Sequence, residues 1–532
     1  LNPWKHPELA RRRYERNVAH LARQGLLPPG ITAAQLLATP PRVERHDPEN
    51  LAPHFAALAQ TRLKTRSDAS PRIRTTLDLD LQHVAETLLH EHLRNAAGLG
   101  IGDAAIVVIE NSTGAIRALA SSGRAEHAAI NAALTPRSSG STLKPFIYLA
   151  AIERHLITAA TLLPDTPQAV LETYADYDPQ NYTHRSYGPV RAREALGNSL
   201  NVPAVVVTSR LGARDAFNSL RRWGFVFSRN FDAYGAGFIL GNADIRLVDL
   251  AAAYAGLARG GIAWSGRALA SEPIESARLA SPAACAIITD ILCDNDARRL
   301  SFGPNSPLNL GQRVAVKTGT SSGFRDRWCV GFDREHTVAV WAGNLDGKSL
   351  GEVLAVRAAA PLWSSMMRYL LDRGDSPLPA PTAGPQLAVA DVAAETGLLP
   401  RPDEPTVHEW FLPGTEPKAS AASHYAKVDG RDTLVLPPEY AAWCAGGENR
   451  LGAIARSENF EIVFPRDGAV FEWSAHLPAG QQTLTPLSTT SVCEWFLNGH
   501  PLRSAAIPLT RGEWTLTARS ADEERTARFT VE

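Results

Sequence analysis

Cysteine is scarce in this sequence, and its spacing argues against a structural zinc site. The 532 residues include five cysteines, which are Cys285, Cys293, Cys329, Cys444 and Cys493. No two of them form a C-x-x-C pair, and no histidine lies at metal-ligand spacing from them. The odd number leaves at least one thiol unpaired within a monomer.

The sequence has no excess of either charge. Its 54 Lys and Arg residues nearly balance 55 Asp and Glu residues, which gives a formal net charge of −1. Proteins that bind nucleic acid or an anionic membrane surface usually carry a basic surplus. The net charge therefore indicates neither a nucleic acid nor an anionic membrane as a partner. We expect no nucleic-acid partner.

Long hydrophobic runs are absent as well. No window approaches 18 consecutive apolar residues, and the opening residues LNPWKHPELARRRYERN lack the apolar core of a signal peptide. The chain also begins with Leu1 instead of methionine. We expect a fragment or processed form whose upstream portion is missing.

The length and the 44% hydrophobic content predict two to four domains with at least one large core. Residues 1–70 are expected to form a connecting subdomain, with one helix over Pro7 to Gln24 and another capped by Thr32. The proline-rich stretch GDSPLPAPTAGP marks the clearest linker, so residues 374–455 are expected to be a linker and accessory region.

Residues 71–373 carry the signals of the main core. TTLDLDLQHVAETLLHEHL has helical periodicity, and AAIVVIENSTGAIRALASS reads as two buried strands joined by a polar turn. Helical stretches such as RLVDLAAAYAGLAR then precede the strand candidates QRVAVKTG and HTVAVWAGN. This order predicts an α+β or mixed α/β core, in which helices cover one sheet. In residues 456–532, the pieces FEIVF, SVCEWFLNG and EWTLTARS predict a small all-β sandwich.

The first candidate catalytic residues are a serine and a lysine three positions apart. Ser141 and Lys144 stand in STLK, directly before an apolar helical run, where positions i and i+3 share a face and can hydrogen-bond. A serine hydroxyl needs a neighbouring base, and a lysine can act as one when burial or a second cation lowers its pKa. A bare S-x-x-K occurs by chance about once in a chain of this length, so further partners are needed.

Those partners follow in order along the chain. Ser199 and Asn201 stand in NSLNVPA, and Lys317, Thr318, Gly319 and Thr320 follow a strand candidate in VAVKTGTSSG. S-x-x-K, an S-D-N-type element and K-T-G together are the signature of serine β-lactamases and penicillin-binding proteins. The combination predicts a serine acyltransferase site.

The residues around these motifs resemble one family closely. RSSGSTLKPFIYLAAIE, REALGNSLNVPAV and KTGTSSGFRDRWCVGFD look like the transpeptidase domain of class A high-molecular-mass penicillin-binding proteins, from about residue 70 to 373. The tail, with CEWFLNGHPLRS and RGEWTLTARS, is similar to the C-terminal domain of their 1C type. The resemblance implies a β-lactamase-like serine transpeptidase fold, an immunoglobulin-like tail, and an upstream glycosyltransferase domain that this chain lacks.

The resemblance also implies a role for each motif residue. Ser141 would attack the D-Ala-D-Ala bond of a peptidoglycan stem peptide, and Lys144 would take its proton. Ser199 would relay a proton to the leaving amine, and Asn201 would orient Lys144 and the acyl chain. Lys317, Thr318, Gly319 and Thr320 would bind the substrate carboxylate, with the backbone N–H groups of Ser141 and Thr320 as the oxyanion hole.

Several consequences and alternatives accompany this resemblance. It implies acylation by β-lactams, no metal or organic cofactor, and a periplasmic position held by a membrane anchor in the missing segment. The C-terminal domain could bind another envelope protein. A β-lactamase is disfavoured because no carboxylate motif for an activated water is identifiable. A DD-carboxypeptidase and a β-lactam-binding scaffold with weak catalysis stay open.

Overall fold

A computed structural model gives the architecture of the chain. It describes residues 3–41, 50–64, 72–122, 125–127, 129–166, 169, 181, 183–263, 265–374, 377–382, 386–428, 430–456, 460–465, 467–471, 473, 482–490, 493–502, 506–520 and 523–532. Part of the predicted linker, residues 375–376 and 383–385, lies outside this set, as do residues 42–49 and 65–70 of the predicted connecting subdomain. No helix among the described residues is both long and apolar enough to cross a membrane.

The chain forms two compact units, Leu1–Pro53 and His54–Glu532. The first contains helices α1 (Pro7–Arg23) and α2 (Ala33–Ala38). Tyr14 joins them by donating a hydrogen bond from its hydroxyl to the carbonyl oxygen of Leu36 at 2.9 Å. Thr32 caps α2 through a reciprocal capping box with Gln35, which confirms the predicted N-cap.

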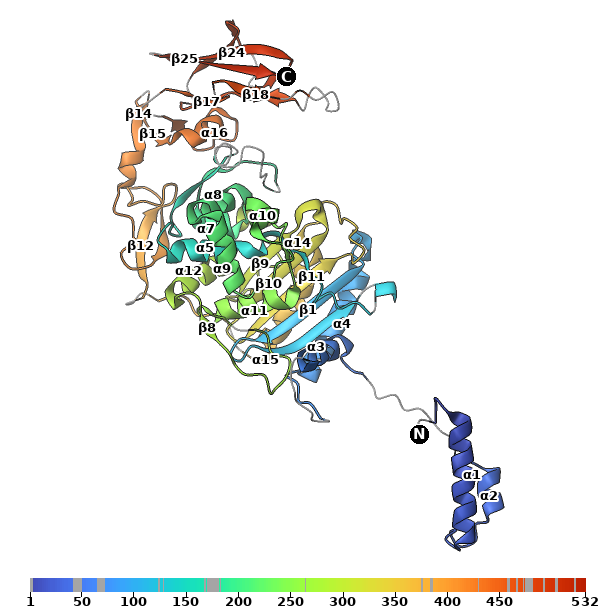
Figure 1. The fold of residues 1–532 in the computed structure, drawn as a ribbon. Helices are drawn as coiled ribbons and strands as arrows, with labels where there is room; N and C mark the ends of the chain where they lie inside the picture. Colours follow the sequence, from blue (N-terminus) through green and yellow to red (C-terminus); the bar gives the residue numbers. More distant parts are fainter. Residues whose placement is uncertain are drawn as a thin grey trace. The chain divides into compact units, whose positions relative to one another are not determined.

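A five-stranded antiparallel sheet lies at the centre of the second unit, in the order β2-β1-β11-β10-β9 (Figure 1). Its strands are β1 (Asp103–Glu110), β2 (Ala115–Ser122), β9 (Ala315–Thr320), β10 (Asp326–Phe332) and β11 (His336–Gly343). The apolar runs that predicted β1, β2, β9 and β11 are almost wholly buried, and the β1–β2 hairpin is confirmed, whereas β10 was not predicted. The sheet joins strands from both ends of a segment of more than 200 residues, and β9 is an edge strand.

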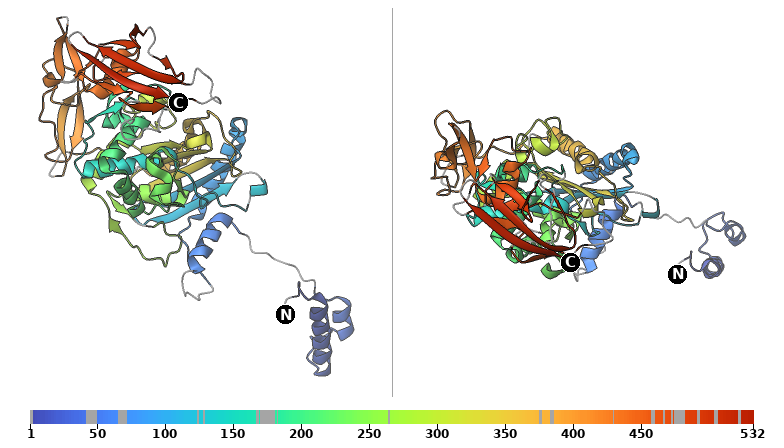
Figure 2. Two further views of the ribbon diagram at one scale, coloured as in Figure 1. Left: turned by 45° about the horizontal axis from the view of Figure 1, so that its top comes forward. Right: turned by 90° about the horizontal axis from the view of Figure 1, so that it is seen from above.

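Helices cover both faces of this sheet (Figure 2). On one face, α4 (Leu79–Asn95) and α15 (Ala360–Arg373) share an apolar cluster with alternate residues of β1, such as Ile106 and Val108. Helix α11 (Leu247–Ala258) contacts β1, β10 and β11 but takes no part in that cluster, so it lies on the opposite face. Helices α5 (Lys144–Glu153), α8 (Asn201–Leu211) and α12 (Pro282–Cys293) pack beside α11 or one another. The predicted helix-covered sheet is confirmed.

The region after α15 is folded, although its sequence shows little periodicity. Strands β12 (Ala388–Ala393) and β13 (Thr406–Phe411) form a hairpin, and β14 (Tyr425–Val428), β15 (Arg431–Leu436) and β16 (Ile454–Ala455) form a three-stranded sheet. We call residues 386–455 the accessory region. It lies beside helices α7 (Ala192–Gly197) and α12 (Figure 1).

The accessory region makes apolar contacts with the core at two places, besides polar contacts such as the ion pair between Glu409 and Arg193. Val392 and Phe411 of the hairpin bury an apolar contact against Ala160. Trp443 of helix α16 (Ala441–Ala445) lies against Gly188 at the start of strand β5 (Gly188–Arg191), which pairs with β4 (Leu162–Asp165). The first contact lies just before β4. The second lies at the start of β5, which leads directly into α7.

The last part of the chain contains several sheets. The largest has the order β18 (Ala469–Phe471), β25 (Glu524–Val531), β24 (Gly512–Arg519), β21 (Glu494–Leu497) and β22 (His500–Pro501). Side chains of this sheet share an apolar cluster with the short pairs β17 (Ile462–Phe464)–β20 (Leu487–Ser488) and β19 (Thr483–Leu484)–β23 (Ile507–Pro508). The three predicted strand pieces are confirmed, except that Ser491 and Val492 lie outside the described residues.

Replacing Gly188 by alanine tests the contact with Trp443. Gly188 has φ +72°, and a Cβ there would lie 2.2 Å from the indole ring. Gly347 has φ +78° with nothing within 4 Å of its position, so Gly347→Ala carries only the backbone penalty of about 1–2 kcal/mol. We expect Gly188→Ala to lose about 1–3 kcal/mol more, because the ring must move. Urea unfolding midpoints measure the difference, and equal midpoints would contradict the packing.

Candidate active site

The two residues of the S-x-x-K motif lie in different local structures. Ser141 belongs to the short 3-10 segment Gly140–Leu143, and Lys144 is the first residue of α5. Ser141 is half-buried, whereas Lys144 is completely buried. The predicted direct hydrogen bond between them is wrong for this structure. Among the described residues, Lys144 donates its hydrogen bonds elsewhere.

The Lys144 ammonium is surrounded by acceptors from the segment 199–201. Its Nζ atom donates to the carbonyl oxygens of Ser199 at 2.7 Å and Leu200 at 2.9 Å, and to Oδ1 of Asn201 at 2.7 Å. Burial and then the positive charge of Lys317 hold the pKa of Lys144 well below its ordinary value, while Asp165 opposes this effect. The site therefore holds a lysine whose neutral form is accessible.

Ser199 connects the two buried lysines. Lys317 donates from Nζ to Oγ of Ser199 at 2.7 Å, and Lys144 binds the carbonyl oxygen of the same residue. Ser199 has φ +62°, a conformation that costs a non-glycine residue free energy and needs support from its surroundings. Burial, followed by the charge of Arg298, lowers the pKa of Lys317 to about 7.

The K-T-G-T residues place an exposed backbone edge beside Ser141. Gly140 has φ +55°, and a Cβ on it would lie 2.5 Å from the backbone nitrogen of Thr320. A Cβ on Gly319 would lie 3.0 Å from the carbonyl oxygen of Ser139 and 3.3 Å from the nitrogen of Ser141. Because neither glycine has a Cβ, the segment around Ser141 and the end of strand β9 can approach each other this closely. The backbone around Ser141 therefore lies next to the backbone around Thr320.

These residues line one cleft of about 380 Å³. Its walls contain the predicted residues Ser141, Ser199, Asn201, Thr318, Gly319 and Thr320. Lys144 and Lys317 do not reach its surface and lie beneath it, bound to the segment 199–201. The structure thus brings all eight predicted residues together.

Several residues of the cleft escaped the sequence analysis. Asn181, Thr183, His184, Phe302 and Phe324 also line it. Phe302 and Phe324 end short helical segments, and the other three lie in irregular chain, where a single polar or aromatic residue carries no periodic signal. Only the contacts between distant segments identify them.

Asn181 and Asp165 form a hydrogen-bonded support behind Lys144. The fully buried Asp165 carboxylate accepts hydrogen bonds from Nδ2 of Asn181 at 2.7 and 2.9 Å and from the backbone nitrogen of Tyr187 at 2.8 Å. Oδ1 of Asn181 accepts from the backbone nitrogen of Asn201 at 2.9 Å. Burial raises the pKa of Asp165 to about 6. The chain of contacts fixes Asn201, which in turn binds Lys144.

Residues next to the motifs are structural. Trp328 and Trp341 are buried and donate from their indole nitrogens to the carbonyl oxygen of Ser138 and to Asp326. Cys329 is fully buried, and burial raises the pKa of its thiol. Both tryptophans therefore belong to the core, and the Cys329 thiol is packed within it. Among the described residues, no group of His, Cys, Asp and Glu side chains could hold a metal ion.

Comparison with known proteins places this arrangement in a family. The family model described as the penicillin binding protein transpeptidase domain matches residues 104–367. Penicillin-binding protein 1C of Escherichia coli (strain K12) is 29% identical over 88% of this chain, and the match covers 65% of that protein. Penicillin-binding protein 1A of Aquifex aeolicus (strain VF5) is 27% identical over 59% of this chain and 44% of its own length. The chain thus spans less than two thirds of either relative.

Solved structures agree with the fold. Penicillin-binding protein 1A from Haemophilus influenzae has a TM-score of 0.62 at 19% sequence identity, over 79% of this chain and 84% of that chain. The PonA1 protein from Mycobacterium tuberculosis, solved in complex with penicillin V, has a TM-score of 0.52 at 21% identity, over 63% of this chain and 96% of that one. The resemblance inferred from the motifs is confirmed. The chain belongs to the penicillin-binding proteins, and residues 104–367 form its transpeptidase domain.

Proposed function

We propose that the chain is a peptidoglycan DD-transpeptidase that works through an acyl-enzyme on Ser141 and is acylated by β-lactams. The observation that carries this proposal is the convergence of Ser141 and the edge strand β9 in one cleft, with two buried lysines directly beneath it. The family of residues 104–367 supports it as well. The proposed donor is a stem peptide that ends in D-Ala-D-Ala.

In the acylation step, Oγ of Ser141 attacks the carbonyl carbon between the two D-alanines. Ser141 turns its hydroxyl towards Lys144 for this step, and the neutral amine, which gives up one of its three hydrogen bonds, accepts the proton on its lone pair. Backbone N–H groups of Ser141 and Thr320 stabilise the oxyanion, and loss of one such donor typically costs about 3 kcal/mol. The intermediate then collapses with cleavage of the C–N bond.

Ser199 and Lys317 act on the leaving group and on substrate binding. The leaving D-alanine amine takes a proton through Oγ of Ser199, which is bound to Lys317. Thr318 and Thr320 hold the terminal carboxylate of the donor along β9, and Lys317, buried beneath the cleft, contributes its positive charge. An amine from a second stem peptide then attacks the ester, which forms the cross-link and releases the serine.

The proposed substrate also bears on location and partners. Peptidoglycan lies outside the bacterial inner membrane, so we propose that the domain acts on the periplasmic side, in a membrane-anchored parent protein with an upstream glycosyltransferase. An envelope protein bound by the C-terminal sheets is a further proposal. No step of the proposed reaction requires a cofactor.

The first experiment is the intact mass of the chain after incubation with benzylpenicillin, compared with Ser141→Ala. We expect one covalent penicillin on the wild type and none on the variant. A modified Ser141→Ala protein would place the nucleophile elsewhere. An unmodified wild type would contradict the proposal and favour a scaffold role.

The fate of the acyl group separates a transpeptidase from a DD-carboxypeptidase. A donor peptide ending in D-Ala-D-Ala is incubated with an excess of an amine acceptor, such as a D-amino acid, and the products are separated by mass. We expect the exchanged or cross-linked product to exceed the hydrolysed peptide. Hydrolysis alone would show that water is the acceptor.

The Asp165→Asn variant tests the electrostatic environment of Lys144. Removal of the carboxylate removes an attraction that raises the pKa of Lys144, so the pKa of this base should fall. The acid limb of the acylation rate against pH should therefore move to lower pH. Because the pKa of Asp165 is about 6, the wild-type and variant profiles should converge below that pH. Lys317 and Glu448 are the other charged groups acting on this pair.

The control is Asp333→Asn, which removes another buried carboxylate at the far end of β10 from Thr320. Its acid limb should coincide with that of the wild type. An unshifted profile for Asp165→Asn would show that Asp165 does not tune the base.

A further inference from the structure

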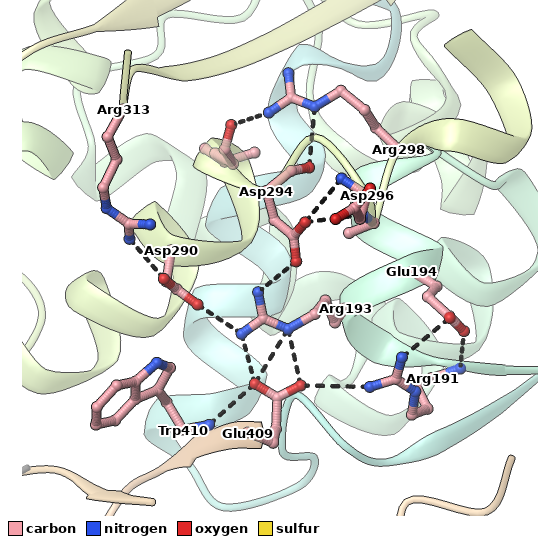
Figure 3. Close-up of polar contacts among 12 residues, drawn as sticks. Arg191, Arg193, Glu194, Asp290, Asp294, Asp296, Arg298, Arg313, Glu409 and Trp410 are labelled. Atoms are coloured by element: carbon pink, nitrogen blue, oxygen red, sulfur yellow. Dashed lines mark hydrogen bonds and ion pairs between the residues drawn. The ribbon is translucent and has the colours of Figure 1, made fainter. Parts of the chain in front are cut away.

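A buried group of charged side chains lies outside the cleft and has no role in the mechanism above. Figure 3 shows Arg193 at its centre, with carboxylates converging on the guanidinium from three sides. We call this group the Arg193 cluster; its members are Arg191, Arg193, Asp290, Asp294, Arg313 and Glu409. Glu409 is completely inaccessible, and Arg193 and Asp290 are each 7% exposed.

Arg193 joins three elements that are far apart in the sequence. It stands on α7 and binds Glu409 of β13 through two nitrogens, with Nε to Oε2 at 2.8 Å and Nη2 to Oε1 at 2.5 Å. It also binds Asp290 of α12 at 2.6 Å and Asp294, directly after α12, at 3.0 Å. A bidentate pair of this kind fixes orientation as well as distance.

Helix α7 leads directly into the active site. Asn198 caps its C-terminal end and precedes Ser199. The side chain of Asn198 donates to the carbonyl oxygen of Ala297 at 2.6 Å and accepts from the backbone nitrogen of Ser301 at 2.9 Å. Asp294 caps the same turn by accepting from the nitrogen of Ala297 at 3.0 Å. The carboxylate that binds Arg193 therefore also orders the turn that holds Asn198.

The β12–β13 hairpin, which carries Glu409, is also fixed to the core by apolar contacts. The β12–β13 hairpin packs Val392 and Phe411 on Ala160, and Gly397 of its connecting turn sits so close that a Cβ would lie 2.0 Å from the carbonyl oxygen of Ala160. Ala160 immediately precedes the segment that becomes β4. The hairpin is thus fixed on the core independently of the cluster, and its carboxylate is presented to α7 from a rigid support.

We propose that Glu409 is a positioning residue for Ser199, acting through Arg193 and α7. The accessory hairpin is then part of the catalytic unit, although it contributes no group to the cleft. Ser199 needs such support because its positive φ must be imposed by its neighbours. This inference rests on the proposed function, since Ser199 matters for rate only if the site acylates.

The test is the acylation kinetics of Glu409→Gln in the full chain, with a fluorescent penicillin. The glutamine keeps the shape of the side chain but removes the charge that holds Arg193. We expect the first-order acylation rate at saturating penicillin to fall about 10- to 100-fold, with the affinity of the preceding noncovalent complex unchanged. The rate is taken per reactive protein, from the amplitude of labelling. If too little of the Glu409→Gln protein folds, the Glu409→Asp variant is used in its place. Aspartate keeps the charge but has a shorter side chain.

The matched control is Asp333→Asn, which also removes a fully buried carboxylate, at the turn between β10 and β11. It should react at the wild-type rate. If Glu409→Gln lowers only the reactive fraction and leaves the rate unchanged, Glu409 is merely structural and the inference is wrong. An equal loss of rate in Asp333→Asn would also overturn it.

Hydrogen exchange gives a readout that does not depend on acylation. Amides in the segment 195–202 should exchange faster in Glu409→Gln than in the wild type or in Asp333→Asn. Unchanged exchange in that segment would contradict the inference. A wild-type protein that exchanges normally but is never acylated would instead overturn the proposed function, and with it the role of Ser199 that this inference requires.

Discussion

Two buried lysines that bind no carboxylate directly among the described residues are the constraint around which this site is built. Lys144 and Lys317 are each at least nine-tenths buried, and both donate a hydrogen bond to Ser199. In a medium of low polarity, two such charges repel each other and lose hydration, so at least one of them is driven towards its neutral form. The protein binds them with carbonyl oxygens, an amide and a hydroxyl, which hold a lysine in place in either protonation state.

The use of uncharged hydrogen-bond partners for these lysines explains how the elements around segment 199–201 are arranged. A carboxylate in direct contact would favour protonated Lys144, whereas Asp165 is linked to it only through two residues, Asn181 and Asn201. The same segment must also adopt a positive φ at Ser199. Both demands require a rigid frame, and that frame comes from α7, from the turn after α12 and from the β4–β5 pair.

The sequence alone was sufficient for the motifs and the main elements. Ser141, Lys144, Ser199, Asn201 and the K-T-G-T residues were all identified, because three short motifs in a fixed order carry a chemical signature. The long apolar runs of β1 and β11 were recognised for a different reason, since a strand buried on both faces has a characteristic composition, whereas β10, which begins with Asp326 and Arg327, was not predicted.

The supporting residues could not be found in this way. Asp165, Asn181 and Glu409 are single polar residues whose partners lie tens to hundreds of positions away, and nothing local distinguishes them from solvated side chains. The accessory region was read as poorly periodic because its strands are short and half-buried. The predicted contact between Ser141 and Lys144 assumed a regular helix, whereas the positive φ of Gly140 starts a 3-10 segment there.

The position of Glu409 in the chain has a consequence for biosynthesis. Ribosomes deliver the polypeptide from its N-terminus, so residues 104–367, which are the whole matched domain, emerge before the carboxylate that neutralises Arg193. Until β13 is made and docked, the nascent domain carries a cation in its interior that lacks its bidentate partner. Under the role proposed for Glu409, the positioning of Ser199 is completed late in the folding of this chain, and truncation immediately after α15 would leave Arg193 without this partner.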